Sequence, residues 1–202
     1  MVSGTSYKIV FLYSINSFLE KVYVAGGNNG QIALNTFEEY DVFTNERHRL
    51  QNMIIPRDEL SLVACNGGIF AIGGGSYNGA VLKSVERYDF NNGIWEKIPD
   101  MIIPRRAHSL CCVNNKIYAF GGFDGEKYLS SVETYDEKAS RWVQIKFMSS
   151  SRCTHVSVKS PDNNSIIIIG GYNGKSLNIV ERFRFFWLIK LGMISRIMNG
   201  VL

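Results

Sequence analysis

A pair of glycines closes a short apolar segment four times in this 202-residue chain, and the four pairs are almost equally spaced. The first glycines of the pairs are Gly26, Gly73, Gly121 and Gly170, at intervals of 47, 48 and 49 residues. A period near fifty with strand-like units indicates an array of small sheets rather than one mixed core. A chain of this kind is expected to act through the loops at the rim of its repeats.

The repeat extends beyond the glycines. A glutamate and an aromatic residue follow each pair about a dozen residues later, a tryptophan follows in two units, and a Met-x-x-Pro-Arg segment comes next. Arg47 replaces the tryptophan in the first unit, so we expect its outer strand to pack less well. The shared positions are Glu38, Tyr40, Met53 and Arg57; Glu86, Tyr88, Trp95, Met101 and Arg105; Glu133, Tyr135, Trp142, Met148 and Arg152; Glu181 and Phe183.

These motifs, in this order, resemble the kelch repeat, which is the blade of a β-propeller. The resemblance covers roughly residues 6 to 183. It implies an all-β fold, a kelch-type β-propeller with about four (incomplete) blades, each a four-stranded antiparallel sheet. Propellers close with about four to eight blades, and the kelch family uses more than four as a rule, so the chain is expected to be part of a ring or to need a second copy.

The third unit shows the expected blade most clearly. It predicts strands at 107–113, 116–120, 131–135 and 141–145, with a hairpin turn at Asn114-Asn115 because asparagine tolerates positive φ. Glycine pairs mark close approach of a neighbour. We expect the tyrosine and tryptophan of each unit to fill that space. The predicted parts are 1–20, an N-terminal segment whose residues 6–19 supply an inner strand and a stretched hairpin; 21–58, 59–106 and 107–153, units one to three; 154–183, a truncated fourth unit; and 184–202, a divergent apolar and basic tail.

The tail breaks the pattern after Glu181, because neither an acid nor a turn residue stands where the outer hairpin needs them. Its longest uncharged apolar run, 185–189, is far shorter than the roughly 20 residues that span a bilayer. We therefore expect no transmembrane segment. A helix lying on a membrane surface and a tail foreign to the propeller are the two interpretations of this segment, and the second is favoured.

Charge and cysteine usage narrow the class of protein. The net charge of +4 lies in the tail, and the repeats are neutral, so we expect no nucleic-acid partner. Cys65, Cys111 and Cys112 fall in inner-strand segments, and Cys153 falls in a loop. Their spacing fits neither a zinc ribbon nor a disulfide framework, so we expect reduced thiols and a cytoplasmic location.

We expect no enzyme, cofactor, metal or catalytic residue. His108 and His155 are repeat equivalents that either line the central channel or open the inner strands and bond neighbouring backbone, and the second reading is favoured. His48 lies far from both, in an outer strand. Some kelch-like propellers are copper oxidases, but their tyrosine, cysteine and histidine set does not appear here. The glycines of 73–75 lack the Gly-Lys-Ser/Thr of a phosphate loop, and no nucleophile elbow is present.

The loops after the glycine pairs and the segments that join successive units are expected on one face. They combine aromatic, amide and arginine side chains, which is the composition of interface anchors. Arg57, Arg105 and Arg152 have an alternative role, which is to hold the loop itself. The candidate partner-binding residues are Asn28, Asn29, Arg57, Asp58, Tyr77, Asn78, Arg105, Arg106, Phe123, Asp124, Arg152, Tyr172 and Asn173, of which Arg106, Tyr77, Phe123 and Tyr172 match best by position in the repeat.

The resemblance implies a non-catalytic protein-protein interaction module. In kelch proteins this face binds peptides, often acidic ones, and a BTB domain links the propeller to a cullin-3 ubiquitin ligase. The sequence contains no BTB domain, so a longer parent or a separate partner is expected to supply it. The alternatives are an actin or cytoskeletal scaffold and a truncated propeller without function.

Overall fold

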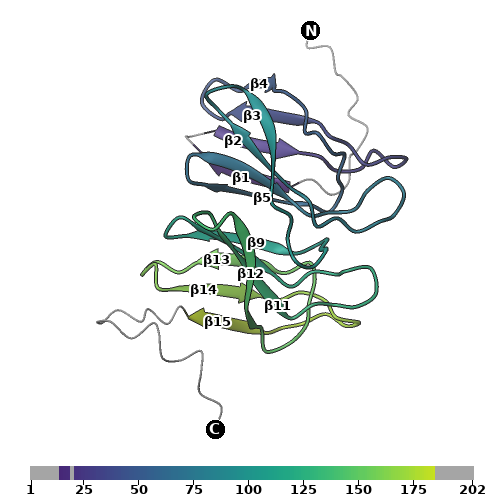
Figure 1. Cartoon of the computed structure of the whole chain (residues 1–202), viewed down its shortest axis with the longest axis vertical. Helices are drawn as coiled ribbons and strands as arrows, with labels where there is room; N and C mark the ends of the chain where they lie inside the picture. Colours follow the sequence, from purple (N-terminus) through teal and green to yellow (C-terminus); the bar gives the residue numbers. More distant parts are fainter. Residues whose placement is uncertain (1–13, 19–20, 185–202) are drawn as a thin grey trace.

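The computed structural model describes residues 14–18 and 21–184, and these residues form four antiparallel sheets (Figure 1). The first contains β1 (Ser14–Phe18), β2 (Lys21–Ala25), β3 (Phe37–Asp41) and β4 (Glu46–Arg49). The second contains β5 (Ser61–Cys65), β6 (Gly68–Ile72), β7 (Val85–Asp89) and β8 (Ile94–Ile98). The third contains β9 (Ser109–Val113), β10 (Lys116–Phe120), β11 (Ser131–Asp136) and β12 (Arg141–Phe147). The fourth contains β13 (Val156–Lys159), β14 (Ser165–Ile169) and β15 (Val180–Arg184).

Each sheet is a meander in which neighbours in sequence are neighbours in space. Tight turns make this order possible, as at Asn114 and Asn115, whose φ angles of 51° and 59° fit the hairpin between β9 and β10. The strands predicted in the third unit are confirmed. β1 is separated from β2 by two residues, because Phe18 pairs with Lys21, so the stretched hairpin expected there is wrong.

The four sheets succeed one another as blades, from β1–β4 at the top of Figure 1 to β13–β15 at the bottom. Their inner strands stand side by side, since β1 contacts β5, β5 contacts β9 and β9 contacts β13. The first and last sheets lie at opposite ends of the view, so the described blades form an open arc. The tail from residue 185 lies outside the described residues, and the described part of the fourth blade ends after three strands.

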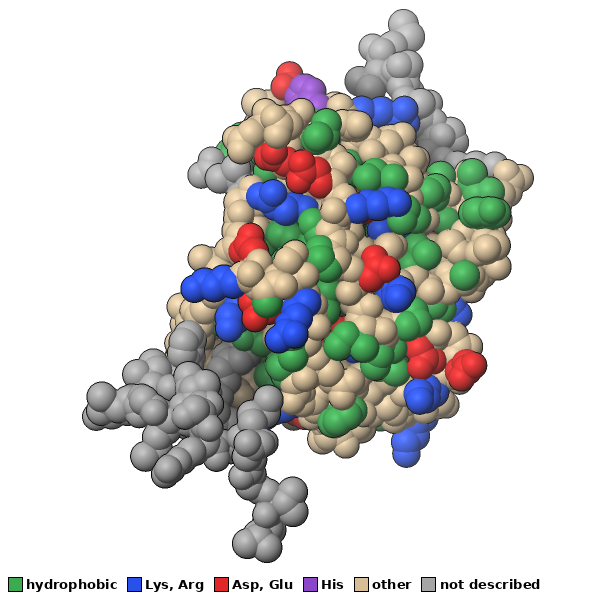
Figure 2. Space-filling model, in the orientation of Figure 1, with side chains coloured by type: hydrophobic (Ala, Val, Ile, Leu, Met, Phe, Trp, Pro, Cys, Tyr) green, Lys and Arg blue, Asp and Glu red, His purple; other side chains and the backbone are tan. Residues whose placement is uncertain are grey.

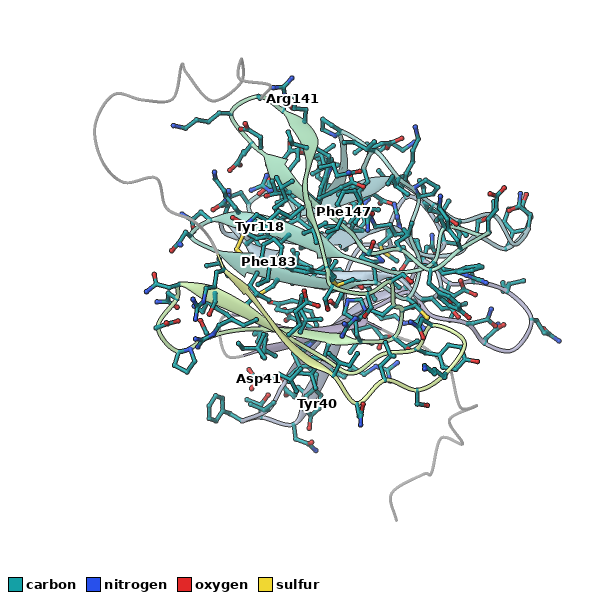
Figure 3. The ribbon with its side chains drawn as sticks, turned by 90° about the horizontal axis from the view of Figure 1, so that it is seen from below. Tyr40, Asp41, Tyr118, Arg141, Phe147 and Phe183 are labelled. Atoms are coloured by element: carbon teal, nitrogen blue, oxygen red, sulfur yellow. A yellow bond between two sulfur atoms is a disulfide. The ribbon has the colours of Figure 1, made fainter. Side chains whose placement is uncertain are left out.

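Hydrophobic cores lie between successive blades rather than within them. Tyr88 and Trp95, cross-strand partners in the second blade, pack on Phe37 of the first. Figure 3 shows the interface of the third and fourth blades, where Tyr118 and Phe183 belong to one buried cluster. The two inner strands are apolar on both faces because each face meets a different neighbour, which is why β6 is buried throughout.

The residues that approach the glycine pairs differ from those expected. A Cβ built on Gly73 would lie 2.3 Å from the carbonyl oxygen of Arg105, 3.0 Å from His108 and 3.2 Å from Met101. Tyrosine and tryptophan fill the space between blades elsewhere along the strands, so their predicted contact with the glycines is wrong. The Met-x-x-Pro-Arg segment makes that contact because it crosses to the next blade over the glycines.

A disulfide joins Cys65 at the end of β5 to Cys112 in β9, with the Cα atoms 5.8 Å apart. The expectation of four reduced thiols is therefore wrong for this pair. The two cysteines are 47 residues apart, which is one repeat, and this spacing places them on adjacent inner strands of the same interface. Cys111 and Cys153 are free and buried.

The first blade shows the consequence of its missing tryptophan. All four residues of β4 are exposed, whereas Trp95 of β8 and Trp142 of β12 are buried. Arg47 instead forms an ion pair with Glu38 on the neighbouring strand, with Nε 2.8 Å from Oε2. The prediction that this outer strand packs less well is confirmed.

Candidate functional site

The segments that join the blades meet the loops after the glycine pairs at one face of the arc. Short antiparallel bridges repeat there, between Arg106 and Phe123 and between Cys153 and Tyr172, and each is closed by two backbone hydrogen bonds of 2.9–3.0 Å. Asp58 pairs with Gly75 in the same way. The two sets of loops that the sequence placed on one face are therefore hydrogen-bonded to each other.

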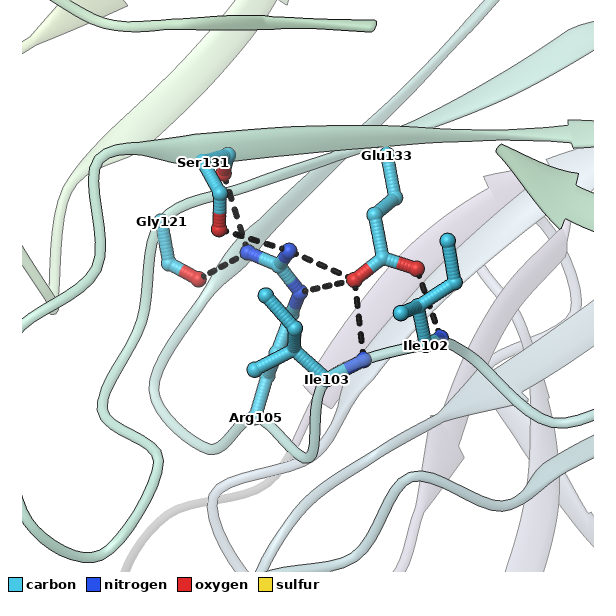
Figure 4. A network of polar contacts seen from close by, with 6 residues as sticks. All are labelled: Ile102, Ile103, Arg105, Gly121, Ser131 and Glu133. Carbon is cyan, nitrogen blue, oxygen red and sulfur yellow. Dashed lines mark hydrogen bonds and ion pairs between the residues drawn. The ribbon is translucent and has the colours of Figure 1, made fainter. Parts of the chain in front are cut away.

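The arginine of each Pro-Arg segment turns into the protein. Arg105 is fully buried and its Nη1 donates to the carbonyl oxygens of Gly121 at 2.7 Å and Ser131 at 3.0 Å (Figure 4). Its Nη2 donates to Glu133 Oε1 at 2.7 Å, and this carboxylate also accepts the backbone N–H groups of Ile102 and Ile103. We call this arrangement the latch, because it fixes the joining segment to the blade that follows.

The latch recurs with the same partners in each joining segment. Arg57 pairs with Glu86 at 2.8 Å with both side chains fully buried, and Arg152 pairs with Glu181 at 3.3 Å. Burial lowers the pKa of Arg57, and the carboxylate of Glu86 opposes that shift. Arg57, Arg105 and Arg152 were candidate binding residues, and the structure instead gives their side chains the alternative role of holding the loop.

Arg106, one residue past the latch, lies at the surface. Its guanidinium carbon is 5.4 Å from the ring centroid of Phe123, and its Nε is 3.4 Å from Glu59 Oε2, with both side chains partly exposed. These residues line a pocket of about 240 Å³ together with Tyr128, whose ring is 5.4 Å from that of Phe123. A guanidinium on an aromatic face at the rim of a pocket is suited to binding a carboxylate.

An aromatic row continues from this pocket to the next blade. The ring of Tyr128 lies 5.9 Å from that of Tyr172 in an edge-on arrangement, and Tyr172 is partly exposed. Tyr77, on the corresponding loop of the second blade, is 78% exposed. Phe123 and Tyr172 are thus brought together with Arg106, whereas Tyr77 does not belong to the pocket.

Polar candidates serve mainly to shape their own loops. The Asn28 side chain accepts from the N–H of Gly30 and donates to Asp58 at 3.1 Å, and Asn29 accepts from the N–H of Ile32. Asn78 accepts in its turn from Ala80. Asp124 accepts from the N–H groups of Glu126 and Lys127, and Asn173 donates its own N–H to the carbonyl oxygen of Lys175.

Sequence reasoning missed a row of strained residues at the pocket. Glu59, Ala107 and Thr154 have φ angles of 46°, 50° and 49°, a region that a threonine in particular rarely adopts. Their backbones form a chain, since the N–H of Thr154 donates to Ala107 and the N–H of Ala107 donates to Glu59. All three line the pocket and all stand two residues after a latch arginine, so the repeat spacing was the signal that marks them. Tyr128 was also missed, and it carried no repeat signal.

The two repeat-equivalent histidines are packed against glycines of the interface. His108 meets Gly73 of the preceding blade and Gly122 of its own blade, and His155 meets Gly121 in the same way. Leu60 takes this position in the second blade, against Gly26. Both ring nitrogens of His108 lack a hydrogen-bond partner among the described residues, so the predicted bond to neighbouring backbone is wrong for this ring.

Burial shifts both histidines toward the neutral form. Desolvation and the charge of Arg152 lower the pKa of His155 to about 4, against the smaller opposing effect of the backbone at Cys153 and Phe120. Desolvation and the charge of Arg105 hold the pKa of His108 well below its ordinary value. His48 lies in β4, exposed and 3.6 Å from Glu46.

Other classes of site were searched in the same part of the chain. Residues 14–18 and 21–184 contain no group of three or more histidine, cysteine or acidic side chains arranged to hold a metal ion. The same residues contain no helix with the length and apolar character required to cross a membrane. Acidic and basic side chains are interspersed on the face that Figure 2 presents.

Comparison with known proteins agrees with this architecture. A solved structure described as "Structure of YjhT" superposes with a TM-score of 0.76 at 16% identity, over 87% of this chain and 66% of that one. The likeness concerns the fold, and the chain spans about two thirds of the length of that protein. No curated protein matches the chain. The family model for the KLHDC2/KLHL20/DRC7 Kelch-repeats domain matches residues 14–186, so the chain belongs to the kelch-repeat family, whose domains are protein-interaction modules.

Proposed function

We propose that this chain binds an acidic segment of a partner protein at the loop-face site formed by Arg106, Phe123, Tyr128 and Tyr172. The observation that carries the proposal is the position of Arg106. Its guanidinium lies over Phe123 at the rim of the pocket and meets a partly exposed carboxylate, that of Glu59. A carboxylate of a bound segment can replace Glu59 without leaving a buried charge unpaired.

The aromatic row supports the same site. Phe123, Tyr128 and Tyr172 offer ring faces and edges next to the guanidinium, and arginine with aromatic residues dominates the energy of protein interfaces. The site rests on a rigid frame, because the backbone on both sides of Arg106 is fixed by the latch at Arg105 and by the bridge to Phe123. Little ordering is then required on binding.

The test compares a short glutamate-rich peptide with a lysine-rich peptide of the same length, each labelled for fluorescence polarisation. We expect the double variant Arg106→Glu and Tyr172→Ala to lose at least about tenfold in affinity for the glutamate-rich peptide, as for hot-spot residues. Its melting temperature should stay within that of the matched control Arg141→Glu, a change at the exposed start of β12. Unchanged binding, or loss of folding in the double variant, overturns the proposal.

For the biological role we propose substrate recognition linked to a cullin-RING ubiquitin ligase, in the cytoplasm and without catalysis by this chain. The support is family membership, since kelch domains that follow a BTB domain act in this way. Co-precipitation of cullin-3 with a parent protein that contains this chain is the expected result. The alternative is a cytoskeletal scaffold. Sedimentation of the purified chain with filamentous actin would favour it, and a clear supernatant with protein that binds the acidic peptide would exclude it.

A further inference from the structure

The two faces of each blade have distinct roles. One face meets the preceding blade, and the other, which we call the forward face, meets the following blade. In the second blade the forward face includes Phe70, Ile72 and Val85, which are buried against the third blade. In the third blade the equivalent residues Phe120 and Val132 are buried against the fourth.

The forward face of the fourth blade is apolar and exposed. Val156 of β13, Ile169 of β14 and Val180 of β15 pair across the sheet and so lie on one face, and Val156 and Val180 are 57% and 68% exposed. Val158 pairs with Ile167 and extends this face by one row. These residues correspond by repeat position to those that are buried in the second and third blades.

Basic side chains frame this apolar face. Arg182 pairs with Ile167 across the sheet, and Arg184 follows two residues later on the same face of β15. Both arginines are exposed, as is Lys159 at the end of β13. Asp162 lies close enough to Arg182 for its pKa to be affected, but its carboxylate already accepts from the N–H of Asn164. The frame therefore carries excess positive charge.

The surfaces that this chain itself could offer to the forward face are also basic. The side of the first blade that faces away from the second contains Val22 and Tyr40, but Arg47 and Arg49 lie beside them on β4. The sequence after Arg184 contains Lys190 and Arg196 and no acidic residue. Contact of either surface with Arg182 and Arg184 would bring like charges together, which opposes association.

We propose that the forward face of the fourth blade docks a partner protein whose apolar contact surface is flanked by aspartate or glutamate. The apolar rows supply burial of the kind that holds the other blades together. Arg182 and Arg184 select an acidic flank over a neutral or basic one. In the described residues β15 pairs with β14 alone, so its outer edge is open to an added strand that carries these side chains.

The probes are two synthetic peptides that alternate valine with glutamate or valine with lysine, titrated into the full chain. We expect the valine–glutamate peptide to bind and the valine–lysine peptide to bind at least about tenfold more weakly. Val180→Asp should abolish binding, and Ile102→Asp, at an exposed aliphatic residue of a joining segment, should not. The double variant Arg182→Glu and Arg184→Glu should reverse the preference between the peptides.

Three outcomes would overturn the proposal. One is absence of binding by both peptides, and another is binding that survives Val180→Asp and the charge reversal alike. The third is concentration-dependent self-association in sedimentation velocity that Val180→Asp removes, because a second copy of the chain would then cover the face. Arg106→Glu should leave binding of the valine–glutamate peptide unchanged, which separates this surface from the loop-face site.

Discussion

The latch arginine and its neighbour show how adjacent residues of one type take different roles. Arg105 is fully buried with its carboxylate, whereas Arg106 is partly exposed and lies over Phe123. A buried ion pair is weak evidence of net stabilisation, but removal of one partner leaves an uncompensated charge. The energetic importance of each arginine therefore follows its burial rather than its charge.

Substitution of the latch arginines tests this point. Arg105→Met should lower the free energy of unfolding by about 3–5 kcal/mol, because Glu133 remains buried and unpaired. Arg152→Met should cost less, since the side chain of Glu181 is 18% exposed and water can reach it. Arg106→Met is the control and should change stability little. Urea titrations that give any other order for the three variants contradict the role of burial.

A second test at the residue scale concerns His155. Its pKa of about 4 in the folded state lies below the ordinary value of 6.5, so the unfolded chain binds the proton more readily. Stability should be complete above about pH 6.5 and fall by roughly 1.4 kcal/mol per pH unit as pH decreases toward 4. His108 adds a loss in the same direction, since its pKa is also lowered.

The variant His155→Leu should flatten this pH dependence, because Leu60 already fills the equivalent position in the second blade. His48→Leu is the matched control, since His48 is exposed in β4. Thermal unfolding of both variants between pH 4 and 7 gives the comparison. Equal slopes for His155→Leu and the unsubstituted chain would show that the histidine does not cause the acid sensitivity.

At the scale of the blade, stability comes from contacts with the neighbouring blade rather than from the sheet itself. The apolar clusters lie between sheets, and the joining segment packs its methionine and arginine carbonyl on the preceding glycine pair. The first blade departs from this pattern. Arg47 stands where later blades have tryptophan and pairs with Glu38, a glutamate that the following blades give to a latch arginine. A terminal repeat with polar substitutions is typical of repeat proteins.

The disulfide between β5 and β9 links the second and third blades covalently. Closure of a loop of 47 residues is expected to stabilise the fold by about 4 kcal/mol through the entropy of the unfolded chain. Reduction, or the variant Cys65→Ala with Cys112→Ala, should lower the unfolding midpoint accordingly. The single change Cys111→Ala, at a free cysteine next to Cys112, is the control and should be insensitive to reductant in its difference from the parent. A midpoint that reductant does not move would contradict the bond. Since the cytoplasmic location was inferred from reduced thiols, it stays a prediction without that support.

At the scale of the whole molecule, the arc has two unlike ends. The third blade has its β11 strand between β10 and β12, whereas β15 of the fourth blade pairs with β14 alone among the described strands. A strand without a second neighbour opens more readily to solvent. We therefore expect the backbone amides of β15 to exchange with deuterium well before those of β11, in native-state exchange read by NMR. Equal protection of the two strands would show that the open edge is covered in solution.

The same difference between ends bears on function. The loop face spans the joining segments of all the described blades, while the forward face of the fourth blade belongs to one end. The two proposed surfaces therefore need not compete for a partner. Because the chain covers 66% of its structural neighbour, the partner at the open end takes the place of structure that the neighbour has in its own chain.

The sequence by itself determined the propeller, the blade boundaries to within a few residues and the face on which the loops gather. It could do so because the glycine pairs, the Glu-x-aromatic motif and the Pro-Arg segments recur in register, and each repeat of a solenoid-like array must pack in the same way. The hairpin at Asn114-Asn115 was predicted for a local reason, the tolerance of asparagine for positive φ.

Only the tertiary structure decided which of these residues face outward and which residues of adjacent blades meet. It separated Arg106 from Arg105, joined Cys65 to Cys112 and placed Tyr128 in the pocket beside Phe123. The physical reason is that burial, ion pairing and disulfide formation depend on the distance between blades, which a motif within one repeat does not specify. The repeat fixes what each blade is made of, and the packing of one blade on the next fixes what remains at the surface.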